Sequence, residues 1–440
     1  MTRAEPQGAV GDVLELAIDA VDDEGRGRGS VAGNSGELDV AVRGALPGDV
    51  VRCQVERVWS AHGIAQARAV SFVREGPLHV ERACPHARPC AGCPTHGVDP
   101  AFALDWKRAR VERALADAGL AVEVAEVEPG RSPRQKVKLV VDSGRVGLYV
   151  PHTHLPADAT RCAHQHPAIT AALAKLAPAL VRITPVRAVI ARAFVEGVGA
   201  VVVSEQALFD HDWAALAKLV DGKPLASLAL RVQPVEGSRN SLVGGEAERF
   251  VGPQALTPLE GGAPVPVDAF CQPDPELAAH LYRRVARFLV GALDGARLAE
   301  ATYFDLYAGA GGFARALVEA GAGRVVAVER AAASATTLVP GSGVAPLPMS
   351  VEQALPQLVG FAQRGLAGMV ADPPKKGLGE VAPALAALGA PRVALVACDP
   401  DAGAKDARVF VDAGYLLTAV EPLDLFAGTI EVETLFLLER

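Results

Sequence analysis

A glycine-rich stretch between Tyr303 and Phe313 constrains the fold more than any other part of the sequence. An apolar run ends there, and the chain passes through a turn that begins near Gly309 directly into a helical pattern at residues 314–320. Glycine lets the backbone turn sharply and approach a ligand that a β-carbon would exclude. The stretch predicts a strand–turn–helix unit that forms a nucleotide pocket, although a plain structural turn would give a similar pattern.

The residues that follow indicate which nucleotide is bound. A second apolar run, residues 325–328, ends on Glu329, and an acidic residue at the end of a second strand can accept hydrogen bonds from both ribose hydroxyls. The spacing D-x-x-x-G-x-G-G, which starts at Asp305, differs from the G-x-G-x-x-G fingerprint of dinucleotide folds. We therefore expect S-adenosylmethionine rather than NAD.

Length and charge limit the class of protein. The chain has 440 residues, enough for two or three domains with cores of their own. Charged residues interrupt every long apolar run, and the N-terminus lacks the apolar core of a signal peptide, so we expect a cytoplasmic monomer without a membrane span. A formal net charge of −8 argues against an indiscriminate nucleic-acid binder but not against a selective one.

Short apolar runs alternate with turns in residues 8–73, which is typical of a small closed β-barrel. The segment resembles a TRAM domain, an OB-like RNA-binding module, in its glycine-rich first turn and in the run from Gly44 to Asp49. Arg26, Arg28 and Arg43 could contact phosphates. A solvated surface is the alternative, because acidic residues outnumber basic ones in this segment.

Four cysteines have a spacing typical of metal ligands: Cys84, Cys90, Cys93 and Cys162. The first three are separated by five and by two residues, and a distant fourth can complete the coordination shell. Zinc, with His86 or His96 as a substitute ligand, is one possibility, and an iron–sulfur cluster is another. Nearby, residues 131–138 carry alternating cations that would suit an RNA backbone.

The last third of the chain alternates strand and helix patterns, which predicts a doubly wound sheet for residues 293–440, after a mixed α/β central domain at residues 74–292. A predicted helix, residues 275–293 with Asp274 as its N-cap, joins the two. Ligands of such sheets lie at the carboxyl ends of the strands. Four polar residues fall at these ends and form a candidate site: Asp305, Glu329, Asp372 and Cys398.

Two of the C-terminal residues have chemistry of their own. Cys398 could be a nucleophile if its thiolate is accessible, whereas a small buried core residue is the alternative. Glu433 begins the last predicted strand beside the sheet rim, where it could act as a general base.

Several motifs occur together and in order along the chain: the four cysteines, Phe270-x-Gln272, Asp305-Leu306-Tyr307-x-Gly309-x-Gly311, Val328-Glu329, Asp372-Pro373-Pro374-x-x-Gly377, Cys398-x-Pro400 and Val432-Glu433. In this combination the sequence resembles the RNA uracil-C5 methyltransferases, specifically the iron–sulfur branch with an N-terminal TRAM domain that acts on 23S ribosomal RNA. The resemblance implies a Rossmann-like class I methyltransferase domain, and it favours a [4Fe-4S] cluster at the cysteines.

The resemblance also implies a covalent mechanism on a uridine in RNA. Cys398 would add to carbon 6, carbon 5 would take the methyl group from S-adenosylmethionine, and Glu433 would remove the carbon 5 proton. The cofactor would be held by Gln272, Tyr307, Gly309, Glu329 and Asp372. A uridine in folded RNA must be flipped out to reach the thiol.

The sequence departs from the family's usual residues at five positions: Asp274, Lys375, Lys376, Asp399 and Glu431. A carboxylate at Asp399 is expected to raise the pKa of Cys398 and to oppose its activation. The segment between Glu329 and Ser350 is also shorter than in the family.

Three alternatives stay open. The protein could be an RNA-binding protein that retains cofactor and cluster with altered catalysis, or a tRNA rather than an rRNA uridine methyltransferase. An RNA cytosine-C5 methyltransferase is the third, but that class presents a second cysteine near its Asp-Pro motif, and Asp372-Pro373-Pro374 has none.

Overall fold

The computed structural model describes residues 8–33, 36–59, 62–81, 84, 90, 92–95, 97–150, 153, 155–234, 247–291, 295–331 and 343–440. These residues form two compact units. Unit 1 comprises Met1–Ala87, Gly92–Arg110 and Gly428–Ile430, and unit 2 comprises Arg88–Ala91, Val111–Ala427 and Glu431–Arg440. No helix within the described ranges is long and apolar enough to cross a membrane. The three predicted domains, 8–73, 74–292 and 293–440, stay a prediction, since compactness alone separates two units.

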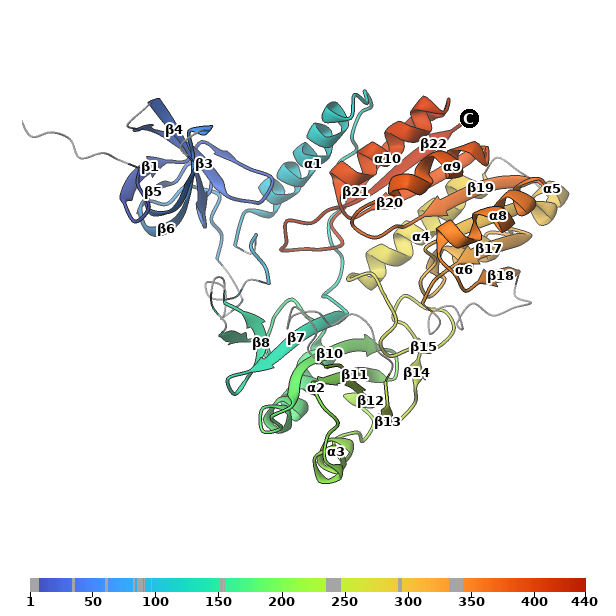
Figure 1. Ribbon diagram of the computed structural model, residues 1–440, viewed down its shortest axis with the longest axis horizontal. Helices are drawn as coiled ribbons and strands as arrows, with labels where there is room; N and C mark the ends of the chain where they lie inside the picture. Colours follow the sequence, from blue (N-terminus) through green and yellow to red (C-terminus); the bar gives the residue numbers. More distant parts are fainter. Residues whose placement is uncertain are drawn as a thin grey trace, which may run out of the picture. The chain divides into compact units, whose positions relative to one another are not determined.

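Unit 1 is built on a six-stranded sheet of order β1-β5-β6-β4-β3-β2 (Figure 1). Its strands are β1 (Val13–Ala17), β2 (Ala20–Val21), β3 (Gly27–Gly33), β4 (Gly36–Arg43), β5 (Val50–Trp59) and β6 (Ile64–Arg74). Alternate side chains of β1 and β5 are buried, which gives the sheet one apolar face. Helix α1 (Pro100–Asp117) starts in this unit, where Trp106 Nε1 donates to the Asp22 carbonyl at 3.1 Å.

The two edges of this sheet meet at one corner. Strands β1 and β2 lie at opposite edges, yet only Ile18 and Asp19 separate them in the chain. At the corner the Ile18 amide donates to the Asp49 carbonyl at 2.9 Å, and the Asp19 amide donates to the Arg28 carbonyl at 3.0 Å. Gly29 has no room for a β-carbon, which would lie 2.1 Å from the Ala17 carbonyl oxygen. The sequence predicted a closed β-barrel, but among the described strands of this sheet no ladder joins β1 to β3 to close it.

The first half of unit 2 contains a seven-stranded sheet of order β13-β12-β11-β10-β7-β8-β9. Its elements are β7 (Lys136–Asp142), β8 (Arg145–Tyr149), β9 (Pro156–Asp158), α2 (Pro167–Leu180), β10 (Val186–Phe194), β11 (Gly197–Ser204), α3 (Asp210–Ala217), β12 (Leu225–Val232) and β13 (Arg249–Val251). Helices α2 and α3 cover one face. The other face packs on the segment of β14 (Ala255–Leu256) and β15 (Val265–Pro266). We call this part the central sheet.

The second half of unit 2 is a doubly wound sheet of order β18-β17-β16-β19-β20-β22-β21 (Figure 1). Its strands are β16 (Thr302–Leu306), β17 (Arg324–Val328), β18 (Val344–Leu347), β19 (Leu366–Ala371), β20 (Arg392–Ala397), β21 (Leu416–Leu423) and β22 (Glu433–Glu439). The first five pair in parallel, and β22 pairs antiparallel with both β20 and β21. We call it the methyltransferase sheet, after the fold that the family resemblance implies for residues 293–440.

Helices cover both faces of the methyltransferase sheet. One face packs on α4 (Pro275–Val290) and α6 (Gly312–Glu319). The other packs on α8 (Val351–Ala362), α9 (Ala382–Ala387), α10 (Pro400–Asp412) and the C-terminal half of α1. The remaining elements are α5 (Gly295–Glu300) and the short 3-10 helix η2 (Gly379–Val381). Because parallel strands that bury both faces need crossover helices, the alternation seen in the sequence produced this arrangement.

The segment at residues 124–128 covers the β21 edge of the sheet. The amide of Ala125 donates to the Val420 carbonyl at 3.0 Å, and the amide of Glu128 donates to the Pro422 carbonyl at 2.9 Å. An exposed edge strand is a template for aggregation, and this pairing satisfies its backbone groups.

Candidate functional site

The polar residues predicted at strand ends lie along one rim of the methyltransferase sheet. Glu329 follows β17, the glycine turn follows β16, Asp372 follows β19, and Cys398 follows β20. These strands are neighbours in the order β17-β16-β19-β20 and run in parallel. Because the carboxyl ends of parallel strands share an edge, the structure brings the predicted residues to one side of the sheet.

The glycine turn has the strained backbone that its sequence implied. Tyr307, Gly309 and Gly311 all have positive φ, at 62°, 54° and 79°, and Gly311 is the N-cap of α6. Glu329 fixes the turn, because its Oε2 accepts from the Gly309 amide at 2.9 Å while Oε1 accepts from Ala331 at 2.6 Å. The turn therefore holds its shape through the same carboxylate that was predicted to bind ribose.

Asp305 lies beneath the turn, fully buried at the end of β16. Its Oδ2 accepts from the Ala314 amide at 2.8 Å, and its Oδ1 has no hydrogen-bond partner among the described residues. Burial raises the pKa of Asp305 to about 8, against the lowering effect of the Ala314 bond, and the charges of Asp372 and Glu329 raise it further. Asp305 is therefore a protonated acid at neutral pH.

Gln272 and Asp372 contact each other across the site. The Gln272 amide nitrogen donates to Asp372 Oδ2 at 3.1 Å. Burial raises the pKa of Asp372 to about 7, and this hydrogen bond opposes the rise. Gln272 is itself placed by the central sheet, because Gln135 Nε2 donates to the Gln272 carbonyl at 2.9 Å and the Gln135 amide donates to Pro273 at 2.9 Å.

Cys398 and Glu433 lie at the same end of two neighbouring strands. Strands β20 and β22 pair antiparallel up to Ala397 opposite Thr434, Cys398 directly follows β20, and Glu433 begins β22. The charge of Glu433 raises the pKa of Cys398, so the two groups are within electrostatic reach of each other. Cys398 is partly exposed, whereas Glu433 is 1% exposed with no partner for Oε1 within the part of the chain that the structure describes.

The charges at this pair favour the protonated forms. Burial raises the pKa of Cys398 to about 12, with further increases from Glu433, Asp372 and Glu431 and a decrease from Lys375. Burial also raises the pKa of Glu433 well above its usual value, and the charges of Asp372 and Glu431 raise it further. These surroundings therefore favour the thiol form of Cys398 and the protonated form of Glu433.

Three departures from the family pattern have structural explanations. Asp399 is the N-cap of α10, and its Oδ1 accepts from the amides of Asp401 at 3.1 Å and Ala402 at 3.3 Å. The helix N-terminus therefore engages the carboxylate that we expected to oppose Cys398. The other two pair with each other, since Lys375 Nζ lies 2.9 Å from Glu431 Oε1.

Asp274, a fourth departure, is an acceptor for five donors. Oδ1 accepts from Glu276 and Leu277 at 3.0 Å, which caps α4, and from the Ser132 hydroxyl at 2.6 Å. Oδ2 accepts from the amides of Arg131 at 2.6 Å and Ser132 at 2.8 Å. A carboxylate can accept on both oxygens, whereas the amide group of the family's asparagine would present a donor to one of these sets.

A pocket lies beside the glycine turn, between α4, α6 and the loop that precedes β15. Its lining residues are Pro258, Glu260, Val265, Phe270, Cys271, Tyr282, Tyr307, Ala308, Gly309, Ala310, Gly312, Phe313, Arg315 and Asp372. Gly312 is required here, because a β-carbon would lie 2.5 Å from Tyr282 Cζ. Sequence reasoning missed Glu260, Tyr282 and Arg315, since no motif marks them and only the packing of the central sheet on α4 places them here.

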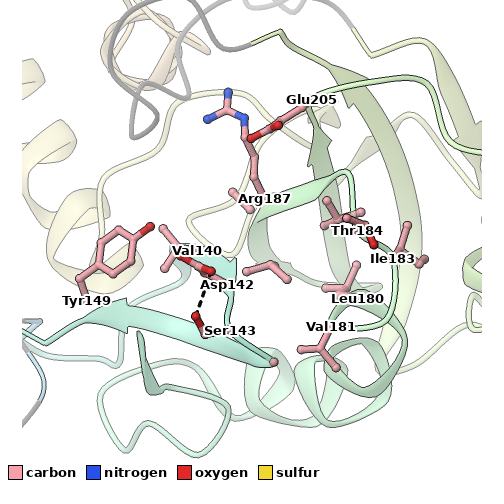
Figure 2. A pocket seen from close by; sticks show the side chains of 14 residues that line it. Val140, Asp142, Ser143, Tyr149, Leu180, Val181, Ile183, Thr184, Arg187 and Glu205 are labelled. Atoms are coloured by element: carbon pink, nitrogen blue, oxygen red, sulfur yellow. Dashed lines mark hydrogen bonds between the residues drawn. The ribbon is translucent and has the colours of Figure 1, made fainter. Parts of the chain in front are cut away.

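A second, larger cavity of about 270 Å³ belongs to the central sheet alone. Figure 2 shows Tyr149, Asp142 and Arg187 around it, with the end of α2 at Leu180 on the other side. None of the predicted site residues lines it.

The four predicted metal ligands, Cys84, Cys90, Cys93 and Cys162, are all partly exposed. Across the described ranges, no three Cys, His, Asp or Glu side chains are grouped as the ligands of a metal ion would be. His86 and His96 lie outside the described residues. The [4Fe-4S] cluster therefore stays a prediction.

The predicted RNA-binding cations are also partly engaged elsewhere. Lys136 Nζ donates to the carbonyls of Asp268 at 3.2 Å and Ala269 at 2.7 Å. Arg134 donates to the Ala427 carbonyl at 2.9 Å, and Arg131 pairs with Glu128 at 2.5 Å. Lys138 is exposed and remains available for phosphate.

Comparison with known proteins finds similar RNA methyltransferases. No family model matches the chain. An RNA methyltransferase of Geobacter sulfurreducens, itself uncharacterized, is 29% identical, with 99% of this chain and 92% of that protein covered. The 23S rRNA (uracil(1939)-C(5))-methyltransferase of Halomonas elongata is 28% identical, with 97% and 89% covered.

A solved structure has the same fold over nearly the full length. The Pyrococcus abyssi tRNA (uracil-54, C5)-methyltransferase, in complex with S-adenosyl-L-homocysteine, superposes with a TM-score of 0.72 at 20% identity, covering 97% of this chain and 99% of that one. The class I methyltransferase fold expected for residues 293–440 is thus confirmed, and so is the resemblance of the chain to the RNA uracil-C5 methyltransferases.

Proposed function

We propose that the protein transfers a methyl group from S-adenosylmethionine to carbon 5 of a uridine in RNA. The observation that supports this most directly is that Cys398 and Glu433 lie at the same end of the paired strands β20 and β22, next to the strand end that carries Asp372. A thiol and an acid–base group that lie near each other can attack one face of a ring and remove a proton from it. The curated relatives named as RNA methyltransferases support the substrate class.

Each residue has one task in the reaction. The Cys398 sulfur forms a bond to carbon 6, and the electron pair of the 5,6 double bond becomes available at carbon 5. Carbon 5 would bond to the methyl group as the bond from that group to the sulfonium sulfur breaks, leaving S-adenosylhomocysteine. Glu433 accepts the carbon 5 proton, and the carbon 6–sulfur bond then breaks to regenerate the thiolate. Without sulfur addition, carbon 5 of uracil is too weak a nucleophile to react.

The cofactor would be held at the rim by Gln272, Tyr307, Gly309, Glu329 and Asp372. Oδ1 of Asp305 and Oε1 of Glu433 are buried without a hydrogen-bond partner among the described residues, and a positive charge bound at the rim would favour the ionised forms of both acids. S-adenosylmethionine would supply the methyl group and a sulfonium charge that favours the ionised forms of the Cys398–Glu433 pair.

The RNA substrate is proposed to be 23S rRNA rather than tRNA, since the Halomonas elongata relative carries that name and covers nearly the full chain. Flipping a uridine out of a folded RNA costs a few kcal/mol. The curled sheet of unit 1, residues 8–73, and the central domain would supply the RNA contacts that repay this cost.

The test combines radiolabelled S-adenosylmethionine with unmodified 23S rRNA and, separately, with unmodified tRNA, followed by nucleoside analysis for 5-methyluridine. Wild-type protein should label 23S rRNA, and Cys398→Ala should reduce the label at least about 10³-fold. Cys53→Ala, in the core of the unit 1 sheet, is the matched cysteine control and should retain activity. Label in cytidine, or label that survives Cys398→Ala, would contradict the mechanism.

A second candidate is an RNA-binding protein with altered catalysis. The pKa of Cys398, raised to about 12, is the observation that favours it, since few thiolates form at neutral pH. In the same assay this candidate predicts RNA binding without label in any nucleoside.

A further inference from the structure

The pocket beside the glycine turn contains two opposite charges that the rim residues do not explain. Glu260 enters from the loop between β14 and β15, and Arg315 enters from the first turns of α6. No ion pair joins these two side chains among those found in the described ranges. Both charges act on the Tyr282 hydroxyl. Burial is the main cause of its raised pKa, Glu260 raises that pKa further, and Arg315 lowers it.

Glu260 has a free oxygen in a buried position. Its side chain is 7% exposed, and Oε1 lies 3.0 Å from Arg192 Nη2. Oε2 has no hydrogen-bond partner within the part of the chain that the structure describes, although it is shielded from solvent. A buried carboxylate oxygen without a donor is costly, so it indicates either a defect or a missing ligand. A ligand with an N–H group that enters the pocket would satisfy it.

Arg315 is held in place by a glycine. A β-carbon on Gly262, which has a φ of +103°, would lie 2.1 Å from Arg315 Nη1, so the guanidinium rests directly on the Gly262 backbone. The turn itself offers few donors, because the amides of Ala308, Gly309 and Gly311 already donate within the protein. An anionic group next to the turn would therefore need the Arg315 side chain.

We propose that Glu260 and Arg315 bind the two charges of the amino-acid end of S-adenosylmethionine. The Glu260 Oε2 accepts from the α-ammonium group, and the Arg315 guanidinium donates to the α-carboxylate. The inference rests on the proposed function, because it assumes that the rim binds this cofactor. It adds that the central sheet supplies part of the cofactor site.

The position of Glu260 gives this contact a structural consequence. Through Arg192, Glu260 is joined to β10, and Arg192 also stacks on Phe194 at 4.6 Å. A cofactor that bonds to Glu260 therefore connects α6 of the methyltransferase sheet to β10 of the central sheet. Cofactor binding is then expected to stabilise the junction between the two sheets.

The test uses three ligands that differ only at the amino-acid end, with affinities measured by isothermal titration calorimetry. S-adenosylhomocysteine has both charges, its decarboxylated analogue keeps only the amine, and 5′-methylthioadenosine has neither. Glu260→Gln should weaken the first two by about 10- to 100-fold, as expected for loss of a hydrogen bond to a charged group, and leave the third unchanged. Glutamine keeps an acceptor for Arg192.

Arg315→Leu supplies the complementary measurement. It should weaken S-adenosylhomocysteine by about 10- to 100-fold and leave both ligands without a carboxylate unchanged. Arg315 is only partly buried, so this variant keeps the test open if Glu260→Gln fails to fold. Binding of 5′-methylthioadenosine reports in each variant that the adenosine site is intact.

The outcomes separate the two proposals. If wild-type protein binds none of the three ligands, the proposed function fails. If wild-type protein binds S-adenosylhomocysteine but either variant binds it equally well, only the present inference is overturned for that residue. Equal weakening of all three ligands also overturns it, since that result shows a role in folding of the pocket rather than in contact with the amino-acid end.

Discussion

The two seven-stranded sheets of unit 2 bury opposite charges in opposite ways. The central sheet withdraws cations from solvent, and each has a partner: Lys136 donates to two carbonyls, Arg192 pairs with Glu260, and Arg231 pairs with Asp268. The methyltransferase sheet buries acids at its rim, and oxygens of Asp305 and Glu433 have no partner among the described residues. Paired charges hold a structure together, whereas unpaired ones indicate where a ligand binds.

The partners of the central cations show what this sheet does for the site. Asp268 and Ala269 precede Gln272 in the loop that leads into α4, and Glu260 lies in the pocket wall. Substitutions in the central sheet should therefore change stability and cofactor binding. Substitutions of the rim acids should change chemistry, with smaller effects on the free energy of unfolding.

The largest expected effect is on catalysis, at the unpaired acid Glu433. Glu433→Gln keeps the size of the side chain but removes the proton acceptor, so turnover should fall about 10²- to 10⁴-fold. Because the methylated adduct cannot eliminate, a covalent RNA–protein complex should accumulate and survive denaturing electrophoresis. The double variant Cys398→Ala/Glu433→Gln should form no complex, and wild-type turnover by Glu433→Gln would show that another group is the base.

The next effect is on stability, at a paired cation. Arg192→Met leaves Glu260 buried without its partner and should cost about 3–5 kcal/mol of the free energy of unfolding, measured by urea denaturation. Arg249 is half-buried but pairs at 2.8 Å with Asp210, whose side chain is 93% exposed, so Arg249→Met should change stability by less than about 1 kcal/mol. Similar losses in the two variants would remove the distinction between paired burial and surface pairing.

Asp305 gives a pH-dependent prediction with a definite sign. Its pKa is about 8 in the folded protein and 3.8 in the unfolded chain, so between these values the folded state holds a proton that the unfolded state has lost. The stabilisation is complete below pH 3.8 and is lost as pH rises through 8, at up to about 1.4 kcal/mol per pH unit.

The Asp305→Asn variant isolates this contribution, because asparagine can accept from Ala314 but does not titrate. Thermal unfolding of the ligand-free protein at pH 5, 6, 7 and 8 should show a smaller decline in Tm for the variant than for the wild type. Parallel curves would mean that Asp305 is ionised in the folded protein.

The smallest expected effect is at Asp274, the acceptor that joins α4 to the loop at residues 130–132. Asp274→Asn presents an amide hydrogen to at least one of its five donors and should cost about 1–3 kcal/mol in urea denaturation. Asp401→Asn, in the first turn of α10, is a control without such a network and should change stability by less than about 0.5 kcal/mol. A neutral Asp274→Asn would show that the network tolerates the family's residue.

Sequence patterns located the residues of the sheet rim but not the residues that line the pocket beside it. Glu329, Asp372 and Cys398 follow apolar runs, and the end of a buried run is visible in the sequence. Glu260 and Arg315 follow no such run, and their meeting in one pocket depends on how a loop of the central sheet packs on α4 and α6. The predicted role of Lys136 in RNA binding was wrong for the same reason, because charge pattern does not reveal that its ammonium group is bonded to backbone carbonyls.

By itself the sequence determined the strand–turn–helix unit at the glycine turn and the positions of Glu329, Asp372 and Cys398 at the ends of apolar runs. These follow from local rules, since periodicity and glycine act within a few residues. Only the tertiary structure decided that the ends of β20 and β22 bring Cys398 near Glu433, that Asp399 caps a helix, and that Glu260 retains an oxygen without a donor. Strand register, capping and burial depend on residues far apart in the chain, so side-chain pairing and pKa values are set by the packed fold.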